Sequence, residues 1–448
     1  MQQSAAFPEV STRGRGSHTV AEHCDRASIF HWEPAGIMQK FQTGPALLPG
    51  IATAPVSGAI RAGERLFLSG ANALQNDSRV TGLGDPAAQT NAALDRLQAA
   101  LSAAGGSLAS LTKLTTCVVD RAYRSHVYAV IARRLPNVRA VSTGLVVAGL
   151  PLAEMIVQID AEAAIPDKSP RYTRPYDFDN WHGQGFAWQG SMVLATDDEF
   201  FVRGQTGAAL DHTGVKAKGR TVVDAGAQAD FAMANLATIL AEAGAAREDI
   251  CKITVYISDR AYRPAVYPMI GKFLKDARPV STGIITSAFA RPDILFEIDV
   301  TVVGKQNGQP HQRVRPYHSS AARYGHQGQQ LDCEFCMAVV AGNRVILRGQ
   351  TGMGLDEKLY GVGSAKAQAE QAMKNVETLL GEAGARLRDV VKATVYVTDR
   401  AFLAEVSEAV MRSLGDAGPA FTAIIVKGLA SPELLMEVDI VALKDASR

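Results

Sequence analysis

The sequence predicts a mixed α/β protein made of three similar units, and an internal repeat is the main observation behind this prediction. The segment VVDRAYRSHVY at residues 118–128 returns as ISDRAYRPAVY at 257–267 and as VTDRAFLAEVS at 397–407. Around each occurrence, segments with the patterns of strands and helices follow in the same order. In a chain of 448 residues, three such copies indicate three folded units of ordinary domain size.

Copy one illustrates the elements of each unit. A β-branched and aromatic run at 65–69 predicts a strand, and residues 87–105 show the apolar spacing of a helix that ends at a glycine. The alternating stretch TKLTTCVV predicts the central strand. Asp120 then precedes a second helix, and its carboxylate can accept hydrogen bonds from the free amides of the first turn. We therefore predict N-caps at Asp120, Asp259 and Asp399, and two further strands close each unit.

The predicted domain boundaries follow from the repeat. They are an N-terminal extension at 1–40, copy one at 41–165, copy two at 166–305 and copy three at 306–448. The last two copies each begin with a polar, proline-bearing join that we interpret as a linker. Both joins contain Arg-Pro-Tyr, so we expect them to dock in similar ways.

Composition excludes several classes of function. Lysine and arginine (46) nearly balance aspartate and glutamate (45), so no overall field would attract nucleic acid or anionic lipid. The chain has no apolar run of about 18 residues and does not begin like a secretory signal, which predicts a cytoplasmic protein with no membrane partner. The CEFC motif at 333–336 lacks a second ligand pair for zinc. We expect no metal and no cofactor.

Three lysines also recur, each just before the central strand of its copy. They are Lys113, Lys252 and Lys392. A lysine near serines invites a catalytic hypothesis, but lysines at strand edges usually point to solvent. We therefore expect a solvent-facing role for them.

At the scale of the whole unit, the order of motifs resembles the Rid/YjgF reactive-intermediate deaminase family. In copy three, the motifs on which this resemblance rests are RGQTG, the helix with GEAG at its end, VVKATVYVTDR and SPELLMEVD. The resemblance implies chorismate-mutase-like units, each a mixed sheet with two helices on one face, arranged around a central barrel. Family clefts lie between units, so three fused copies imply an intramolecular pseudo-trimer. Further self-association of the chain is left open.

The family pattern also points to site positions, and this sequence departs from it. The family's carboxylate-binding arginine falls on Ser142, Ser281 and Phe421, so no copy keeps it. The family's water-positioning glutamate falls on Gln158, Glu297 and Glu437. The family's serine-glycine turn is Ser69-Gly70 in copy one, but Arg203-Gly204 and Arg348-Gly349 in the other copies. We infer that the missing arginine has moved to this turn in copies two and three.

These positions define the candidate site. The predicted catalytic residues are Glu297, Glu437, Arg203 and Arg348. The predicted substrate contacts are Gly204, Gly349, Tyr267, Thr282, Thr422, Cys336 and Ser191. Two alternatives stay open at this point: the arginines could form buried structural bridges with nearby acids, and Cys336 could be a nucleophile if a neighbouring arginine lowered its pKa.

The function that this reading favours is hydrolysis of a C–N bond in a small nitrogen compound, as in an enamine or imine deaminase or an amidohydrolase. In it the glutamate activates water, the arginine stabilises negative charge and the amides of the glycine turn form an oxyanion hole. The alternative is a non-catalytic pseudo-trimer that binds a small molecule. A ribonuclease is disfavoured by the balanced charge.

Overall fold

Each copy folds around the same four-stranded sheet in the computed structural model, which describes residues 29–30, 38–43, 56–166, 168–177, 188–197, 199–210, 224–319 and 331–444. The sheet orders are β4-β7-β5-β6 in copy one, β10-β15-β12-β13 in copy two and β20-β23-β21-β22 in copy three. In each sheet the last pair of strands is parallel and the others are antiparallel. The repeat in the sequence is thus a repeat in the fold.

The elements of copy one are β3 (Ala59–Ala62), β4 (Arg65–Leu68), α1 (Pro86–Ala103), β5 (Leu111–Val118), α2 (Arg124–Arg134), β6 (Val141–Val146) and β7 (Val157–Ala164). Those of copy two are β8 (Arg171–Asp177), β9 (Gln189–Ala195), β10 (Glu199–Val202), β11 (Gln205–Thr206), α4 (Ala225–Ala243), β12 (Ile250–Ile257), α5 (Arg263–Leu274), β13 (Val280–Ile285), β14 (Ala288–Phe289) and β15 (Phe296–Val303). Those of copy three are β16 (Gln312–Val314), β17 (Tyr317–His318), β18 (Glu334–Phe335), β19 (Ala338–Ala341), β20 (Arg344–Leu347), α6 (Ala365–Glu382), β21 (Val390–Val397), α7 (Leu403–Leu414), β22 (Ala420–Ile425) and β23 (Met436–Leu443).

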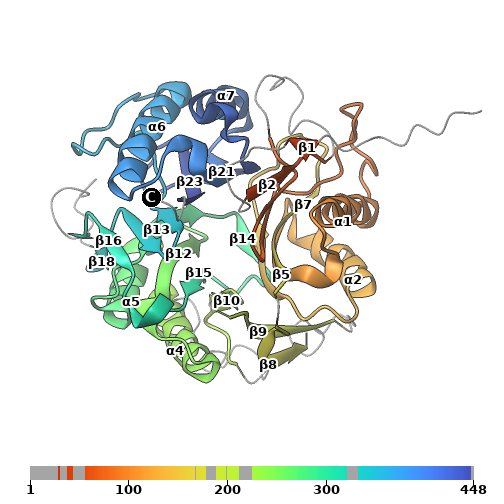
Figure 1. The fold of residues 1–448 in the computed structure, drawn as a ribbon, viewed down its shortest axis with the longest axis horizontal. Coiled ribbons are helices and arrows are strands. Elements are labelled where there is room, and N and C mark those ends of the chain that lie inside the picture. Colours follow the sequence, from red (N-terminus) through yellow and green to blue (C-terminus); the bar gives the residue numbers. More distant parts are fainter. Residues whose placement is uncertain are drawn as a thin grey trace, which may run out of the picture.

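The three copies surround a common centre, with their sheets inside and two helices of each copy at the periphery (Figure 1). Each helix pair buries its apolar face on its own sheet, as Leu94, Leu97 and Leu101 of α1 do in copy one. The fold is therefore the predicted arrangement of three α/β units in one chain. The closed central barrel that the family resemblance implies stays a prediction.

The joins between copies are part of the sheets rather than simple linkers. Strand β8 pairs with β9, and β16 pairs with β19, so each join adds an edge strand to its copy. In copy one, β2 (Met38–Phe41) takes the same place beside β3. This strand lies at the boundary of the predicted N-terminal extension, of which residues 1–28 and 31–37 lie outside the described residues.

In the repeated Asp-Arg pair, the aspartate caps a helical turn of its own copy and the arginine donates a hydrogen bond to the next copy. The Asp259 carboxylate accepts a hydrogen bond from the amide of Ala261 at 2.9 Å, at the start of a short 3-10 turn that leads into α5. Arg260 then donates to the carbonyl of Leu429 in copy three at 2.9 Å. Arg121 and Arg400 make the equivalent bonds to Phe289 and Leu150. The motif is thus both a cap and a contact between copies.

The recurring lysines do not face solvent as expected: Lys113 and Lys252 are buried, and Lys392 is half-buried. Lys252 pairs with Asp439 of the next copy at 2.5 Å, and Lys392 pairs with Asp160 at 2.6 Å. Lys113 makes the same contact with Asp299. Each lysine is desolvated because the sheets of two copies meet there, and an acid of the neighbouring copy compensates its charge.

Candidate functional site

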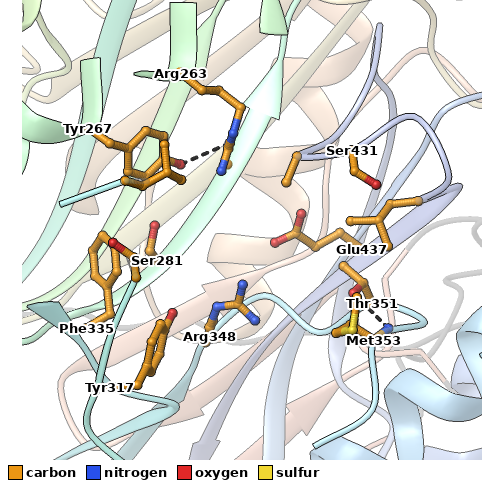
Figure 2. Close-up of a pocket in the computed structure, with 15 residues that line it drawn as sticks. Arg263, Tyr267, Ser281, Tyr317, Phe335, Arg348, Thr351, Met353, Ser431 and Glu437 are labelled. Atoms are coloured by element: carbon orange, nitrogen blue, oxygen red, sulfur yellow. Dashed lines mark hydrogen bonds between the residues drawn. The ribbon is translucent and has the colours of Figure 1, made fainter. Parts of the chain in front are cut away.

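A cavity of about 90 Å³ lies between copies two and three (Figure 2). Copy two contributes α5 and β13 to its walls, and copy three contributes β17, β18, the turn after β20 and β23. Its lining side chains include Arg263, Tyr267, Ser281, Tyr317, Phe335, Arg348, Thr351 and Glu437. The cavity therefore unites residues from distant parts of the sequence.

Glu437 places a buried carboxyl group in this cavity. Glu437 is 5% exposed. Burial raises the pKa of its carboxyl from 4.5 to about 8, and the nearby charge of Asp439 acts in the same direction. The cations Arg348, Lys252 and Arg263 lower this pKa without cancelling the effect of burial. At neutral pH the carboxyl consequently holds its proton and can donate it.

The glycine of the RGQTG turn makes room for this carboxyl. A Cβ atom on Gly349 would collide with the Glu437 carboxyl and would lie 2.9 Å from the Thr282 hydroxyl. The turn is held in place because the side chain of Gln350 donates to the carbonyl of Arg348 at 2.7 Å. A side chain at position 349 is therefore incompatible with the observed position of Glu437.

An oxyanion hole made of several turn amides, as predicted, is not what the turn offers. The amide of Arg348 donates to Met337, and the amide of Gln350 donates to Val438, both at 2.9 Å. Sheet hydrogen bonds thus already engage the amides on both sides of Gly349. The Arg348 guanidinium is the stronger candidate for stabilising negative charge in this cavity.

Arg263 was not singled out from the sequence, and it is the second guanidinium of the cavity. It opens α5, donates to the Tyr267 hydroxyl at 3.3 Å and lies 4.6 Å from the centre of that ring. A Cβ on Gly283 would come within 2.7 Å of the tyrosine oxygen and 2.9 Å of the arginine, so glycine leaves space for both groups. The spacing DRAYRxxxY in copies one and two was the available signal.

Aromatic rings form the wall of the cavity that faces Glu437 (Figure 2). Phe335 meets Tyr267 edge-to-face at 6.4 Å and Tyr317 at 6.1 Å between ring centres. Tyr317 belongs to the second Arg-Pro-Tyr join, and Arg315 of that join pairs with Glu382 at the end of α6. The first join docks in the same way through Arg174 and Glu242. The joins thus dock alike, as expected, and they deliver a tyrosine to each of two interfaces.

The interface between copies one and two gathers the equivalent groups. Burial raises the pKa of Glu297 to about 7, and Arg203 is the largest opposing influence. Arg203 donates to the Tyr176 hydroxyl at 3.0 Å and stacks 4.2 Å from its ring centre. On the other side of this interface, Arg124 lies 4.7 Å from the ring centre of Tyr128. The predicted Arg203 and Glu297 are thus brought together.

The interface between copies three and one is filled differently. The amide of Phe421 donates to the Ser69 hydroxyl at 2.8 Å, and Gln158 donates to the carbonyl of Ala423 at 2.9 Å. The amide of Gly70 donates to the carbonyl of Phe421 at 3.1 Å. Copy one therefore closes this interface with hydrogen bonds where the other two interfaces place arginine and glutamate.

The remaining predicted contacts lie outside the lining of the cavity. Thr282 donates to Asp439 at 2.5 Å and Thr422 to Asp160 at 3.0 Å, next to the recurring lysines. Cys336 is fully buried, donates to the carbonyl of Ala338 at 3.2 Å and has its pKa raised by burial to about 12, which disfavours a nucleophilic thiolate. Ser191 is buried at the equivalent position in copy two.

Neither a metal cluster nor a membrane span is found in the part of the chain that the structure describes. No group of three or more histidine, cysteine, aspartate or glutamate residues is placed there to hold a metal ion. In the same residues, no helix has the length and apolar character needed to cross a bilayer.

Comparison with known proteins agrees with the repeat. The family model described as endoribonuclease L-PSP matches residues 49–165, 190–304 and 330–444. The chain belongs to this family, also called Rid/YjgF. Each match spans one copy, so this Rid/YjgF protein carries the family domain three times.

Two relatives illustrate the sequence matches. A RutC family protein of Pyrococcus abyssi is 32% identical over 111 residues, which are 25% of this chain and 87% of that protein. A 2-iminobutanoate/2-iminopropanoate deaminase of Dermatophagoides farinae is 33% identical over 63 residues, 14% of this chain and 49% of the relative.

Two solved structures illustrate the structural matches. A YjgF/YER057c/UK114 family member from Mycobacterium tuberculosis is 30% identical, with 30% of this chain and 99% of that chain covered and a TM-score of 0.24. A chorismatase is 14% identical, with 75% and 93% covered and a TM-score of 0.49.

Proposed function

We propose that the protein hydrolyses a C–N bond of a small imine, enamine or amide in the cavity between copies two and three. The observation that carries this proposal is the buried Glu437 carboxyl, whose pKa of about 8 lets it give and take protons near neutral pH, beside Arg348 in the same cavity. The similarity to a relative named as an imine deaminase supports the same class of reaction.

For an imine, Glu437 serves first as an acid and then as a base. It donates its proton to the imine nitrogen, and its carboxylate then accepts a proton from water as the water oxygen bonds to the carbon. The nitrogen of the resulting amino alcohol then accepts a proton from Glu437. The C–N bond breaks with the electron pair leaving on nitrogen, and the hydroxyl proton returns to Glu437. The products are a carbonyl compound and ammonia.

Arg348 has the second role in this scheme. Its guanidinium binds a substrate carboxylate, or the oxygen that becomes negative when an amide is attacked. Arg203 and Glu297 supply the same pair of groups at the interface of copies one and two. That interface is therefore a second candidate site for the reaction. The interface between copies three and one has serine and glutamine at these positions.

The test is hydrolysis by wild-type protein, Glu437→Gln and Glu297→Gln, followed as ammonia release above the spontaneous rate from 2-imino acids generated in situ and from ureido acids, and as formation of the ring-opened amino acid from ring amides. We expect Glu437→Gln to lose activity by roughly 100-fold or more, because removing a general acid–base group typically costs that much. Circular dichroism checks that each variant is folded. Hydrolysis that persists at the wild-type rate in both variants, or no hydrolysis of any compound by folded wild type, would reject the proposal.

A further inference from the structure

The cavity is built from two half-sites that belong to different copies. We define the helix half as the arginine, tyrosine and glycine at 263, 267 and 283, and the turn half as the arginine and glutamate at 348 and 437. Every interface takes its helix half from one copy and its turn half from the next. The helix half is Arg124, Tyr128 and Gly144 in copy one and Leu403, Ser407 and Ala423 in copy three. The turn half is Ser69 and Gln158 in copy one and Arg203 and Glu297 in copy two.

The two halves are present together and absent together. Both are complete at the interfaces of copies one with two and two with three. At the interface of copies three and one, the helix half and the turn half are both replaced, although they lie on opposite ends of the chain. Helix α7 starts at Leu403 and packs on its sheet without the arginine and tyrosine, so these residues are not required by the fold. The arginine and tyrosine of the helix half therefore occur only at interfaces that also have the arginine and glutamate of the turn half.

The charge of the cavity shows what the second arginine adds. The guanidinium and carboxyl groups lining it are those of Arg263, Arg348 and Glu437, and two tyrosines, Tyr267 and Tyr317, add hydroxyl groups. Asp439, which does not line the cavity, is paired with Lys252. Figure 2 shows the two guanidinium groups and the carboxyl converging on the middle of the cavity from separate walls. With Glu437 protonated, the lining carries two positive charges.

Arg263 is also poorly compensated by the protein itself. Its residue is 7% exposed, and its Nε atom is buried without a hydrogen-bond partner among the described residues. Within the part of the chain that the structure describes, its head group contacts the hydroxyl and the ring of Tyr267, which are uncharged. A buried cation with a neutral partner is costly, and an anion from a ligand would offset that cost.

We propose that the substrate of this cavity carries two anionic groups, one bound by Arg348 and the other by Arg263, with the C–N bond between them facing Glu437. The cavity of about 90 Å³ suits a compact dicarboxylic imine, enamine or amide. The assignment of the reaction rests on the proposed function. The assignment of two anionic groups rests on the two arginines.

Binding of unreactive acids tests the charge preference without requiring turnover. Isothermal titration of the full-length protein compares malonate and succinate with acetate and propionate. We expect the dicarboxylates to bind at least about tenfold more tightly, because a second charge-assisted hydrogen-bond pair is formed. In the Arg124→Leu background, where the helix half of the other complete interface is disabled, Arg263→Leu introduces the residue that copy three carries and should remove this preference. Gly283→Ala should weaken it by displacing the same head groups.

Two controls keep the result specific. Arg79→Leu removes one charge at a side chain that is 85% exposed and should leave the preference intact. Arg124→Leu disables the other complete interface and should leave the preference of the cavity between copies two and three intact. Equal binding of mono- and dicarboxylates by the Arg124→Leu protein, or a preference that survives Arg263→Leu in that background, would overturn the proposal.

Activity and binding separate the two proposals. If no compound is hydrolysed but malonate binding depends on Arg263, the dianion site stands and the hydrolase is rejected. If a monocarboxylic imine is hydrolysed as well as its dicarboxylic counterpart, and Arg263→Leu does not alter their ratio of kcat/KM, the hydrolase stands and the dianion site is rejected.

Discussion

At the scale of single residues, two glutamates in equivalent positions have different electrostatic surroundings. After burial, the strongest influence on Glu437 is Asp439, which raises its pKa, whereas the strongest on Glu297 is Arg203, which lowers it. The pKa values of about 8 and about 7 reflect this difference in their neighbours. The proposed chemistry is placed at Glu437 because its buried carboxyl lines a cavity together with Arg348 and Arg263.

These pKa values predict how stability depends on pH. Both carboxyls have a folded pKa above the reference value of 4.5, so their contribution is fully present below pH 4.5 and is lost as pH rises through about 7 and about 8. For each pH unit over which the folded state binds one proton more than the unfolded state, the free energy of unfolding falls by about 1.4 kcal/mol. Urea unfolding should therefore show a steeper loss of stability with rising pH in wild type than in the Glu297→Gln/Glu437→Gln double variant. Parallel curves would contradict this.

Gly349 provides a second prediction at this scale. Gly349→Ala should lower activity by roughly 100-fold, because the added methyl group displaces the general acid–base carboxyl of Glu437. Gly381 lies in α6 with nothing within 4 Å of an added Cβ, so Gly381→Ala is the matched control. It should keep activity and gain up to about 1 kcal/mol from helix propensity. Equal activity in both variants would show that the turn does not position Glu437.

At the scale of elements, a short turn performs two tasks in each copy. Its aspartate ends the central strand by capping the next turn, and its arginine reaches a carbonyl of the following copy, as Asp259 and Arg260 do. Helices α2, α5 and α7 are therefore placed relative to the neighbouring sheet as well as their own. Because α5 presents Arg263 and Tyr267 to the cavity, the cap also fixes the geometry of the helix half.

The cap can be tested by substitution. Asp259→Ala should destabilise the protein by about 1 kcal/mol, since the freed amide of Ala261 loses its acceptor. Asp259→Ser keeps an acceptor oxygen and should lose less. Thermal denaturation of the three proteins under one buffer condition gives the order. If serine is no better than alanine, the contribution of Asp259 does not come from capping.

The comparison of sequence with structure also belongs to the element scale. The repeat predicted the strands, helices and caps, because these depend on local spacing along the chain. Glu437 and Arg348 could be placed from the resemblance to the family. Arg263 and Tyr317 were missed as site residues, since a helix start and a join become walls of a cavity only when two copies meet. Cys336 was overvalued because its burial cannot be read from its position in CEFC.

At the scale of the whole molecule, three lysine–aspartate pairs join the copies in a cycle. Lys113 of copy one pairs with Asp299 of copy two, Lys252 of copy two pairs with Asp439 of copy three, and Lys392 of copy three pairs with Asp160 of copy one. All six residues line a central cavity of about 150 Å³. The charges are balanced pair by pair, so each pair favours contact with the next copy in the cycle and disfavours a shifted arrangement.

The last pair closes the cycle and can be broken without touching the proposed active cavity. In Lys392→Met the Asp160 carboxylate loses its cation and keeps a hydrogen bond from Thr422. We expect a loss of about 2–3 kcal/mol, somewhat below that of fully buried pairs because both side chains keep some exposure.

Lys392→Met/Asp160→Asn removes both charges and should recover most of this loss, since no unpaired charge remains. Urea unfolding of the two single variants and the double variant forms the cycle that measures the coupling. Malonate binding between copies two and three should change little in all three, because Arg263 and Arg348 keep their surroundings. Additive losses would show that the pair does not hold copies three and one together, and copy one would then be kept in place by the Arg400 bond to Leu150 and the hydrogen bonds of Ser69 and Gln158.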